Sequence, residues 1–283
     1  NMKKDKSEGI IFIYSDYIYS GLLPMALALE HLGFEKYGGQ NILDYPEWRE
    51  GSDNISTKRE PIDHLWNPMS QKKGRRGKYI ILTGDPSLSP NNNEERKKSM
   101  APNNSNGEEI KIILGNAVTS EGMDFKNIRE IHVLDPWYHL YKIEQIIGRG
   151  IRLCSHSDIR KDKRNVTVYL HTSSIKPEIE SIDTNTYRIA EEKASQIGFI
   201  EKILKENAID SILNKQINHI KNMKDLTIVT SRKNKMIMDV NDKEYSKVCS
   251  FIKCGMDIKS IDENIQTDTT TYTLDNIKHQ IKL

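Results

Sequence analysis

The sequence predicts a parallel, doubly wound α/β fold, and two observations lead to this prediction. Short apolar runs rich in β-branched or aromatic residues recur along the first 175 residues. Stretches with helical spacing of apolar residues lie between these runs. Runs this short are typical of buried strands rather than helices. Because strands alternate with helices, we expect one parallel sheet with helices on both faces.

The individual elements follow from length and periodicity. Five runs are short, apolar and β-branched, and we predict each as a buried strand. They cover residues 10–14, 79–82, 110–114, 131–134 and 166–170. Two stretches have apolar residues at helical spacing instead and are predicted as helices, at residues 22–32 and 141–151.

Two long stretches interrupt this alternation. Residues 36–78 are heavy in Gly, Pro, Asp and Asn, and residues 86–109 contain two runs of asparagine. We expect both to be loops or insertions in the sheet domain. Loops of this length are often functional.

The composition changes after residue 175. Helical spacing with many Lys and Glu continues through two further stretches, and weak strand-like runs follow in a polar tail. The helical stretches are 182–204 and 206–220, and the strand-like runs are 227–229 and 236–238. We therefore predict a sheet domain at residues 1–175 and a mainly helical extension with a polar tail at residues 176–283.

Charge and hydropathy exclude several classes of protein. Lys plus Arg number 42 against 40 for Asp plus Glu, which excludes a histone-like or a strongly acidic chain. No apolar run approaches the roughly 18 residues of a membrane helix, so we expect no membrane partner. The chain opens at Asn1 without an apolar signal segment, and we expect a piece of an intracellular protein.

The three cysteines, Cys154, Cys249 and Cys254, do not form an even disulfide framework. We expect free thiols and therefore a reducing compartment, with the cytosol as the default. The pair Cys249-x₄-Cys254 is at best half of a zinc site, because no second ligand pair stands at a suitable spacing. No metal site is predicted in this chain.

The most informative stretch for chemistry is the helical segment that contains Gln145, Gly148, Arg149, Gly150 and Arg152. The two glycines would let backbone pack tightly beside the first arginine. The two arginines stand three residues apart and project toward one spot. Two guanidinium forks at one spot match the charge of a phosphoryl group in transfer. A surface helix with two solvated arginines is the alternative for an arbitrary R-x-x-R pair.

The motifs around these arginines resemble those of superfamily 2 helicases and translocases. Q-x-x-G-R-x-x-R at 145–152, preceded by T-S-E-G-x-D at 119–124, resembles motifs VI and V of their second RecA-like lobe. Residues 11–15 with Gly21 resemble motif IV, and residues 80–85 resemble the next strand and its T-G turn. The resemblance covers about residues 9–174 and implies a RecA-like sheet.

A narrower resemblance points to the helicases of large cytoplasmic DNA viruses. G-R-G-I-R-L-C-S-H at 148–156, R-N-V at 164–166 and the downstream L-K-E-N-A-I-D at 204–210 are similar to that group. It includes poxvirus nucleoside triphosphatase I and the small subunit of the poxvirus early transcription factor. This resemblance implies a viral protein of the host cytoplasm or the virion.

The resemblance implies roles for individual residues. Arg149 and Arg152 would face the γ-phosphate of ATP, and Gln145 would position the nucleotide or the attacking water. Residues near the nucleotide at the interface between lobes would be Glu121, Gly122, Asp124 and Gly148. Residues along the nucleic-acid face would be Thr83, Gly84 and Thr119, whose hydroxyls and backbone N–H groups can hold phosphates without reading bases.

A basic loop at 72–78 adds a second candidate nucleic-acid contact. Its cations are Lys72, Lys73, Arg75, Arg76 and Lys78, with no acidic residue among them. Each phosphate that such a loop neutralises would add to the salt dependence of binding. A solvated loop is an equally weighted alternative.

Other residues have two open interpretations. His156 would be a metal or acid–base residue, or a structural hydrogen-bonding one, and the second is favoured. Trp137, with its neighbours Tyr138 and His139, would stack on a base or cap the following helix, and the cap is favoured.

The nucleotide-binding motifs of a complete helicase are not found in this sequence. A Walker A loop needs G-x-x-x-x-G-K-[ST], because its amides and lysine cradle the phosphates. Gly77-Lys78 is followed by Tyr79, and no strand ends in a Walker B acidic pair. ATP and Mg²⁺ would therefore be held mainly by a separate amino-terminal RecA-like lobe, and we expect this chain alone not to hydrolyse ATP.

Two other functions remain open at this point. The chain would be part of a viral early transcription factor or a transcription-termination nucleoside triphosphatase, binding DNA and recruiting the viral RNA polymerase. An ordinary Rossmann-like enzyme would need a Gly-rich loop after its first strand, and residues 14–17 offer none. The favoured hypothesis is the carboxy-terminal part of an ATP-dependent DNA or RNA helicase or translocase.

Overall fold

The chain divides into two compact units in the computed structural model. One unit comprises Asn1–Ala194 with Lys224–Val240, and the other comprises Ser195–Met223 with Asn241–Leu283. The structure describes residues 7–39, 41–43, 77–120, 123–174, 179–211 and 223–258. The domain boundary near residue 175 stays a prediction, because compactness alone does not identify the segment that folds independently.

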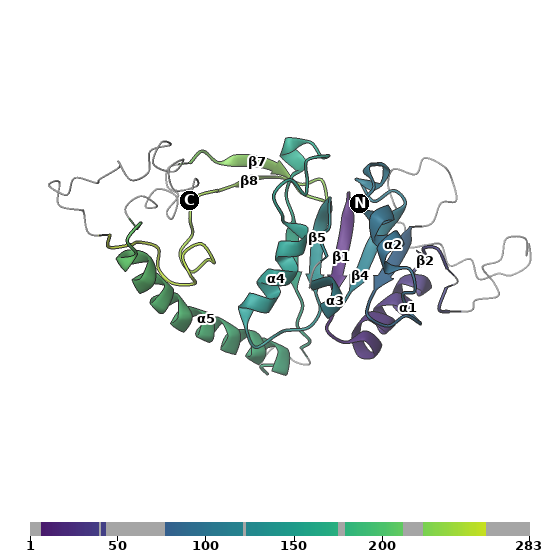
Figure 1. The fold of residues 1–283 in the computed structure, drawn as a ribbon, viewed down its shortest axis with the longest axis horizontal. Coiled ribbons are helices and arrows are strands. Elements are labelled where there is room, and N and C mark those ends of the chain that lie inside the picture. Colours follow the sequence, from purple (N-terminus) through teal and green to yellow (C-terminus); the bar gives the residue numbers. More distant parts are fainter. Residues whose placement is uncertain are drawn as a thin grey trace, which may run out of the picture. The chain divides into compact units, whose positions relative to one another are not determined.

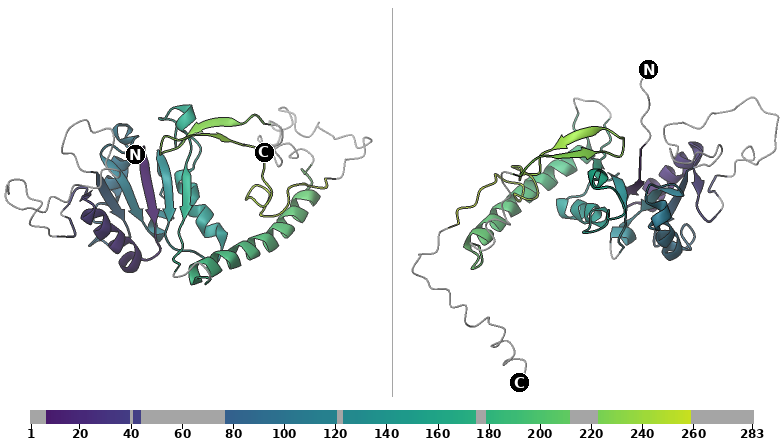
Figure 2. Two further views of the ribbon diagram at one scale, coloured as in Figure 1. Left: turned by 180° about the vertical axis from the view of Figure 1, so that it is seen from behind. Right: turned by 90° about the horizontal axis from the view of Figure 1, so that it is seen from above.

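The first unit contains a six-stranded parallel sheet (Figures 1 and 2). Its strand order is β2-β3-β4-β1-β5-β6. The strands are β1 (Ile10–Tyr14), β2 (Glu35–Lys36), β3 (Lys78–Leu82), β4 (Ile110–Gly115), β5 (Ile128–Val133) and β6 (Thr167–Leu170). All five predicted strands are confirmed. Strand β2 is an addition, since a two-residue polar strand has no hydrophobic pattern to reveal it.

Four helices of the described residues lie in the connections between the strands of this sheet. They are α1 (Leu23–His31), α2 (Asn92–Ser99), α3 (Ala117–Ser120) and α4 (Leu140–Gly150), with a π-helical turn at Ile18–Leu22 and 3₁₀ turns at Pro102–Asn104 and Lys161–Lys163. Helices α1 and α4 correspond to the predicted helices at 22–32 and 141–151.

The sheet is buried on both faces, as a doubly wound sheet requires. Alternate residues of β1 belong to two separate apolar clusters: Phe12 lies in one, and Ile11 and Ile13 lie in the other. The first cluster includes Ile146 of α4, and the second includes Leu29 of α1. These two helices therefore cover opposite faces. The chain is confirmed as α/β with a parallel RecA-like sheet.

The segment 86–109, predicted as a loop or an insertion, is not a loop throughout, and its place as an insertion stays a prediction. It contains α2 and a 3₁₀ turn. Glu94 and Glu95 lie in the first turn of α2 and Arg96, Lys97 and Lys98 in its last turn. This order of charges favours a helix through the macrodipole, although the segment has almost no apolar residue to give a periodic signal.

The extension combines a long helix with a two-stranded hairpin. Helix α5 spans Ile182–Asn207, and the antiparallel strands β7 (Leu226–Val229) and β8 (Lys235–Met238) match the two predicted strand-like runs. The predicted helical stretch at 206–220 lies mostly outside the described residues. In the part of the chain that the structure describes, no helix is both long and apolar enough to cross a bilayer.

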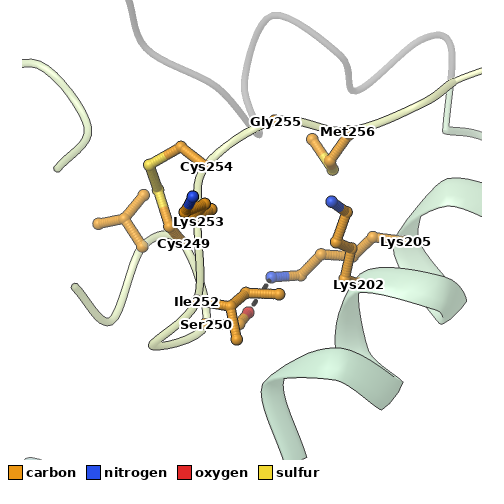
Figure 3. A pocket seen from close by; sticks show the side chains of 10 residues that line it. Lys202, Lys205, Cys249, Ser250, Ile252, Lys253, Cys254, Gly255 and Met256 are labelled. Carbon is orange, nitrogen blue, oxygen red and sulfur yellow. Dashed lines mark hydrogen bonds between the residues drawn. A yellow bond between two sulfur atoms is a disulfide. The ribbon is translucent and has the colours of Figure 1, made fainter. Parts of the chain in front are cut away.

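The cysteine prediction was wrong for two of the three residues. Cys249 and Cys254 form a disulfide, with their α-carbons 5.0 Å apart, and Cys154 is free and exposed. The bond lines a pocket of the second unit beside Lys202 and Lys205 of α5 (Figure 3). A tight turn brings the two α-carbons within bonding range, and spacing in the sequence alone does not reveal such a turn. Two of the three cysteines are therefore not the free thiols on which the prediction of a reducing compartment was based.

A group of buried charges lies at the amino-terminal ends of the central strands. Lys111, Arg129 and Glu130 are each only 2% exposed. The Lys111 ammonium donates to the carbonyl oxygens of Ser7 and Gly9 at 2.7 and 2.6 Å. Burial lowers the pKa of Lys111 to about 8, against the attraction of nearby carboxylates. Unpaired charges this deep would strongly destabilise the fold, so the partners of this group matter.

The hairpin of β7 and β8 supplies several of those partners, although the residues in contact are at least 100 positions apart in the chain. Arg129 Nη2 donates to the Val229 carbonyl at 2.8 Å, and the Ser231 hydroxyl donates to the Glu130 carboxylate. Arg232 lies 3.8 Å from the same carboxylate. The segment 224–240 thus belongs to the sheet unit because it neutralises and hydrogen-bonds the buried charges.

Candidate nucleotide and nucleic-acid site

Helix α4 has one buried stripe and one stripe that faces away from the core. Ile143 and Ile146 are 3% and 2% exposed and hold the helix on the sheet. Gln145 and Arg149 stand one turn apart on another side, and Arg152 follows just beyond the helix end at Gly150. The amphipathic pattern therefore presents the predicted catalytic residues together, away from the core.

The carboxylate of Asp124 forms ion pairs with both arginines. Asp124 lies in the connection before β5, and its two oxygens are 3.7 Å from Arg149 Nη1 and 2.7 Å from Arg152 Nη1. The side chains are 17% exposed for Arg149, 46% for Arg152 and 53% for Asp124. Two guanidinium groups thus converge on one solvent-accessible anionic group, which confirms that they project toward one spot.

Backbone and histidine contacts fix this convergence. The Phe125 N–H donates to the Arg149 carbonyl at 3.3 Å, and the Asn127 N–H donates to the Ser155 carbonyl at 2.9 Å. His156 Nε2 donates to the Ile128 carbonyl at 2.6 Å, while Nδ1 accepts from the Ser155 hydroxyl at 2.8 Å. Burial lowers the pKa of His156, which favours the neutral ring that this arrangement needs. His156 is therefore structural, as the sequence favoured.

The two glycines around Arg149 have different environments. A β-carbon at Gly150 would lie 2.9 Å from Ile131 Cδ1 and 3.4 Å from Ile128 Cβ, so a side chain there would force residues of β5 to shift. A β-carbon at Gly148 would meet no atom within 4 Å. The prediction that both glycines serve packing was therefore wrong for Gly148, which borders open space beside Arg149.

Matched alanine substitutions are expected to separate these two roles. Gly150→Ala should lower the free energy of unfolding by about 1–3 kcal/mol through overpacking. Gly148→Ala should raise it by up to about 1 kcal/mol, because alanine favours the helix more than glycine does. Urea unfolding of both variants measures this difference. Equal destabilisation by the two substitutions would contradict the packing found here.

The residues predicted on a nucleic-acid face lie near the carboxyl ends of the strands, but only one of them is exposed. Thr83 and Thr119 are fully buried. The Thr83 hydroxyl lies 2.8 Å from that of Ser89, and the Thr119 hydroxyl donates to the Asn116 carbonyl at 2.6 Å. Gly84 is exposed. The two hydroxyls are thus engaged inside the protein, and their predicted contact with phosphates stays a prediction.

Several predicted residues lie outside the described part of the chain. They are Glu121, Gly122, Lys72, Lys73, Arg75 and Arg76. Their predicted roles therefore stay predictions. Among the residues that are described, no group of three or more His, Cys, Asp or Glu side chains is placed to hold a metal ion.

Sequence reasoning missed the link between Asp124 and both arginines. The residues are 25 and 28 positions apart, and one buried strand separates them. No periodicity connects residues across such a distance. Only the return of α4 along the sheet brings its carboxyl end back to the start of β5.

Comparison with known proteins gives the family context. Residues 55–154 match the helicase conserved C-terminal domain. A putative helicase of Invertebrate iridescent virus 3 is 34% identical over 79% of this chain and 20% of its own length. A putative ATP-dependent RNA helicase of Acanthamoeba polyphaga mimivirus is 38% identical over 76% of this chain and 32% of its own. Nucleoside triphosphatase I of Amsacta moorei entomopoxvirus is 36% identical over 38% of this chain and 17% of its own length.

These three relatives are viral proteins, and this chain spans between about a sixth and a third of their lengths. The matched domain includes the Gln145 to Arg152 motif and the Asp124 connection. The sheet order and the arginine geometry agree with the same assignment. Residues 55–154 of the chain thus match the helicase conserved C-terminal domain, and the chain is related to putative helicases and a nucleoside triphosphatase of viruses.

Proposed function

We propose that this chain is the second RecA-like lobe of an ATP-dependent helicase or translocase and that it supplies Arg149 and Arg152 to ATP bound by a first lobe. One observation carries the proposal: both guanidinium groups converge on the same accessible carboxylate, that of Asp124. A site that holds two guanidinium groups around one anionic group also suits phosphate oxygens, which guanidinium forks grip in pairs.

The chemistry assigned to this chain is charge stabilisation. Bound Mg²⁺ATP would supply the phosphoryl group, and negative charge is redistributed between that group and the leaving group in the transition state. The guanidinium of Arg149 or Arg152 leaves Asp124 and stabilises that charge, while Asp124 keeps the pair aligned before the nucleotide arrives. Gln145 lies one helical turn from Arg149 and orients the nucleotide or the attacking water.

The open space around Gly148 supports a partner at this surface. A β-carbon there meets no atom of this lobe, so the absence of a side chain leaves room for the nucleotide or for the first lobe. Cycles of closing and opening between the lobes would move the protein along DNA or RNA. Recruitment of a viral RNA polymerase is part of the alternative function and depends on surfaces beyond this site.

ATP hydrolysis by the complete protein tests the proposal. We expect the complete protein to hydrolyse ATP with Mg²⁺ and to be stimulated by single-stranded DNA, duplex DNA or RNA. Residues 1–283 alone should show no turnover, because half of a composite site cannot stabilise the transition state. A phosphate-release assay on both proteins decides this. Turnover by residues 1–283 alone, or none by the complete protein with any nucleic acid, would refute the proposal.

A further inference from the structure

A disulfide closes a short ring of residues beside the second half of helix α5. Cys249 and Cys254 are five positions apart, and we call residues 249–254 the disulfide ring. Both cysteines are partly exposed, and both line the pocket shown in Figure 3. The disulfide ring and this half of the helix belong to the same compact unit. A small solute can therefore reach the bond from solvent.

The disulfide ring packs closely on one side of α5. A β-carbon at Gly198 would overlap the Ser250 carbonyl oxygen, so only a residue without a side chain lets the ring approach the helix this far. The Ser195 hydroxyl donates to the Phe251 carbonyl at 3.0 Å. Lys205 Nζ donates to the Ser250 hydroxyl at 2.9 Å. The ring is thus docked on the helix through its own backbone and one serine side chain.

Two residues inside the disulfide ring have a backbone conformation that L-residues disfavour. Ser250 and Phe251 have φ angles of 54° and 58°, in the left-handed region that favours glycine. Residues other than glycine stay in this region only where the surrounding structure fixes them. The disulfide and the contacts with α5 supply that constraint here. Loss of the bond is therefore expected to let both residues relax and the ring leave the helix.

Ammonium groups line the same pocket as the disulfide. Lys202 and Lys205 come from α5 and reach toward the disulfide ring, as Figure 3 shows, and Lys253 is an exposed member of the ring. The two helical lysines also pair with Glu206 and Glu201, at 3.8 and 4.0 Å respectively. Because ammonium groups stabilise a thiolate, they assist the departure of a cysteine sulfur when another thiol attacks the disulfide.

We propose that the Cys249–Cys254 bond is a redox switch: a dithiol opens it, and the disulfide ring stays docked on α5 only while the bond is intact. A thiolate of the dithiol attacks one sulfur, the S–S bond breaks and a mixed disulfide forms. The second thiol of the reductant then displaces the remaining protein sulfur. The protein gains two electrons and two protons as two thiols, and the dithiol loses them and becomes a disulfide.

The small size of the disulfide ring favours a local switch over a brace for the whole fold. The entropy that a disulfide removes from the unfolded chain grows with the number of residues it encloses, and this bond joins residues only five positions apart. It therefore constrains the unfolded chain less than a bond between distant segments would. Such a bond can open while the rest of the fold stays intact. The inference concerns one compact unit and does not rest on the proposed function.

The redox state and the local hydrogen exchange of the complete protein test this inference. Alkylation followed by trypsin separates residues 248–253 from residues 254–259, so an intact bond appears as two linked peptides. Dithiothreitol at neutral pH, without denaturant, should convert them into two alkylated peptides. Hydrogen–deuterium exchange of residues 245–252 should then become at least about tenfold faster, because several of their amides are hydrogen-bonded within this segment. Exchange in strand β1 should not change.

Three variants separate the bond from the docking. The double variant Cys249→Ser, Cys254→Ser should exchange rapidly from the start and should not respond to dithiothreitol. Gly198→Ala should exchange rapidly even with the bond intact, because its methyl group displaces the disulfide ring from α5. The matched control is Cys154→Ser, which removes a free and exposed cysteine and should behave as wild type.

Several results would overturn the inference. One is free thiols at both positions before any reductant is added, and another is a bond that resists dithiothreitol in the folded protein. A bond that opens with no change in exchange at residues 245–252 would show that α5 holds the ring without it. Faster exchange throughout the chain on reduction would make the bond a brace for the whole fold instead. None of these results bears on ATP hydrolysis, so the proposed function would stand or fall separately.

Discussion

Arg149→Ala or Arg152→Ala in the complete protein is expected to reduce ATP turnover by about 100-fold or more. The reason is that each guanidinium acts mainly on charge that develops in the transition state, so nucleotide affinity should change much less. Arg152→Lys should not restore turnover, because an ammonium lacks the planar fork that grips two oxygens. Turnover, nucleotide affinity and melting temperature should be measured on the same variants.

The matched control is Arg160→Ala. Arg160 is also an exposed arginine in an ion pair, at 2.8 Å from Asp162, but it lies outside the cluster around Asp124. Its loss should leave turnover within about twofold of wild type, since exposed ion pairs contribute little. Near-normal turnover in both Arg149→Ala and Arg152→Ala would remove the basis for a catalytic role of this lobe.

Glu130→Ala is expected to lower the free energy of unfolding by about 3 kcal/mol or more, the cost of leaving buried cations without their counter-charge. Burial alone would raise the pKa of Glu130, but hydrogen bonds from His132, Ser231 and Ser7 together with Arg232 lower it to about 2. The folded state therefore stabilises the ionised carboxylate. Urea unfolding near pH 7 measures the loss.

The difference in unfolding free energy between wild type and Glu130→Ala is expected to depend on pH in a definite direction. A folded-state pKa below the ordinary 4.5 contributes stability that is present above that value and is lost as pH falls toward 2. The difference between wild type and Glu130→Ala should therefore shrink between pH 5 and pH 2. Glu180→Ala, which removes an exposed carboxylate paired with Arg188 at 3.0 Å, should cost less than about 1 kcal/mol. A loss in Glu130→Ala no larger than in this control would mean that the buried charges do not depend on Glu130.

The sheet could be predicted because most of its strands are short apolar runs that are visible in the sequence. A strand buried on both faces is mostly apolar, so β1 and β3 are visible as short apolar runs, and β4 is an apolar run interrupted by Lys111. The start of β5 was missed for the opposite reason. Arg129 and Glu130 are polar and fully inside the fold, and they satisfy their charges through a hairpin that is distant in the sequence.

The candidate site also has one part that could be predicted from the sequence and one part that depends on tertiary packing. The spacing of Gln145, Arg149 and Arg152 places them on one side of a helix, and this follows from the helical repeat alone. The ion pairs of both arginines with Asp124 depend on tertiary packing, because α4 has to run back along the sheet to reach the start of β5. The same packing distinguishes Gly150, against Ile131, from Gly148, which faces open space.

The sequence by itself therefore determined the class of fold, seven strands, three helices and the arginine motif, because each rests on local periodicity or on side-chain chemistry within one segment. The tertiary structure decided the Asp124 cluster, the burial of Thr83 and Thr119, and the Cys249–Cys254 bond. These depend on contacts between segments far apart in the chain. Such contacts cannot be predicted from periodicity, because the spacing of residues within a segment indicates its own helix or strand and not the distant segment that it contacts.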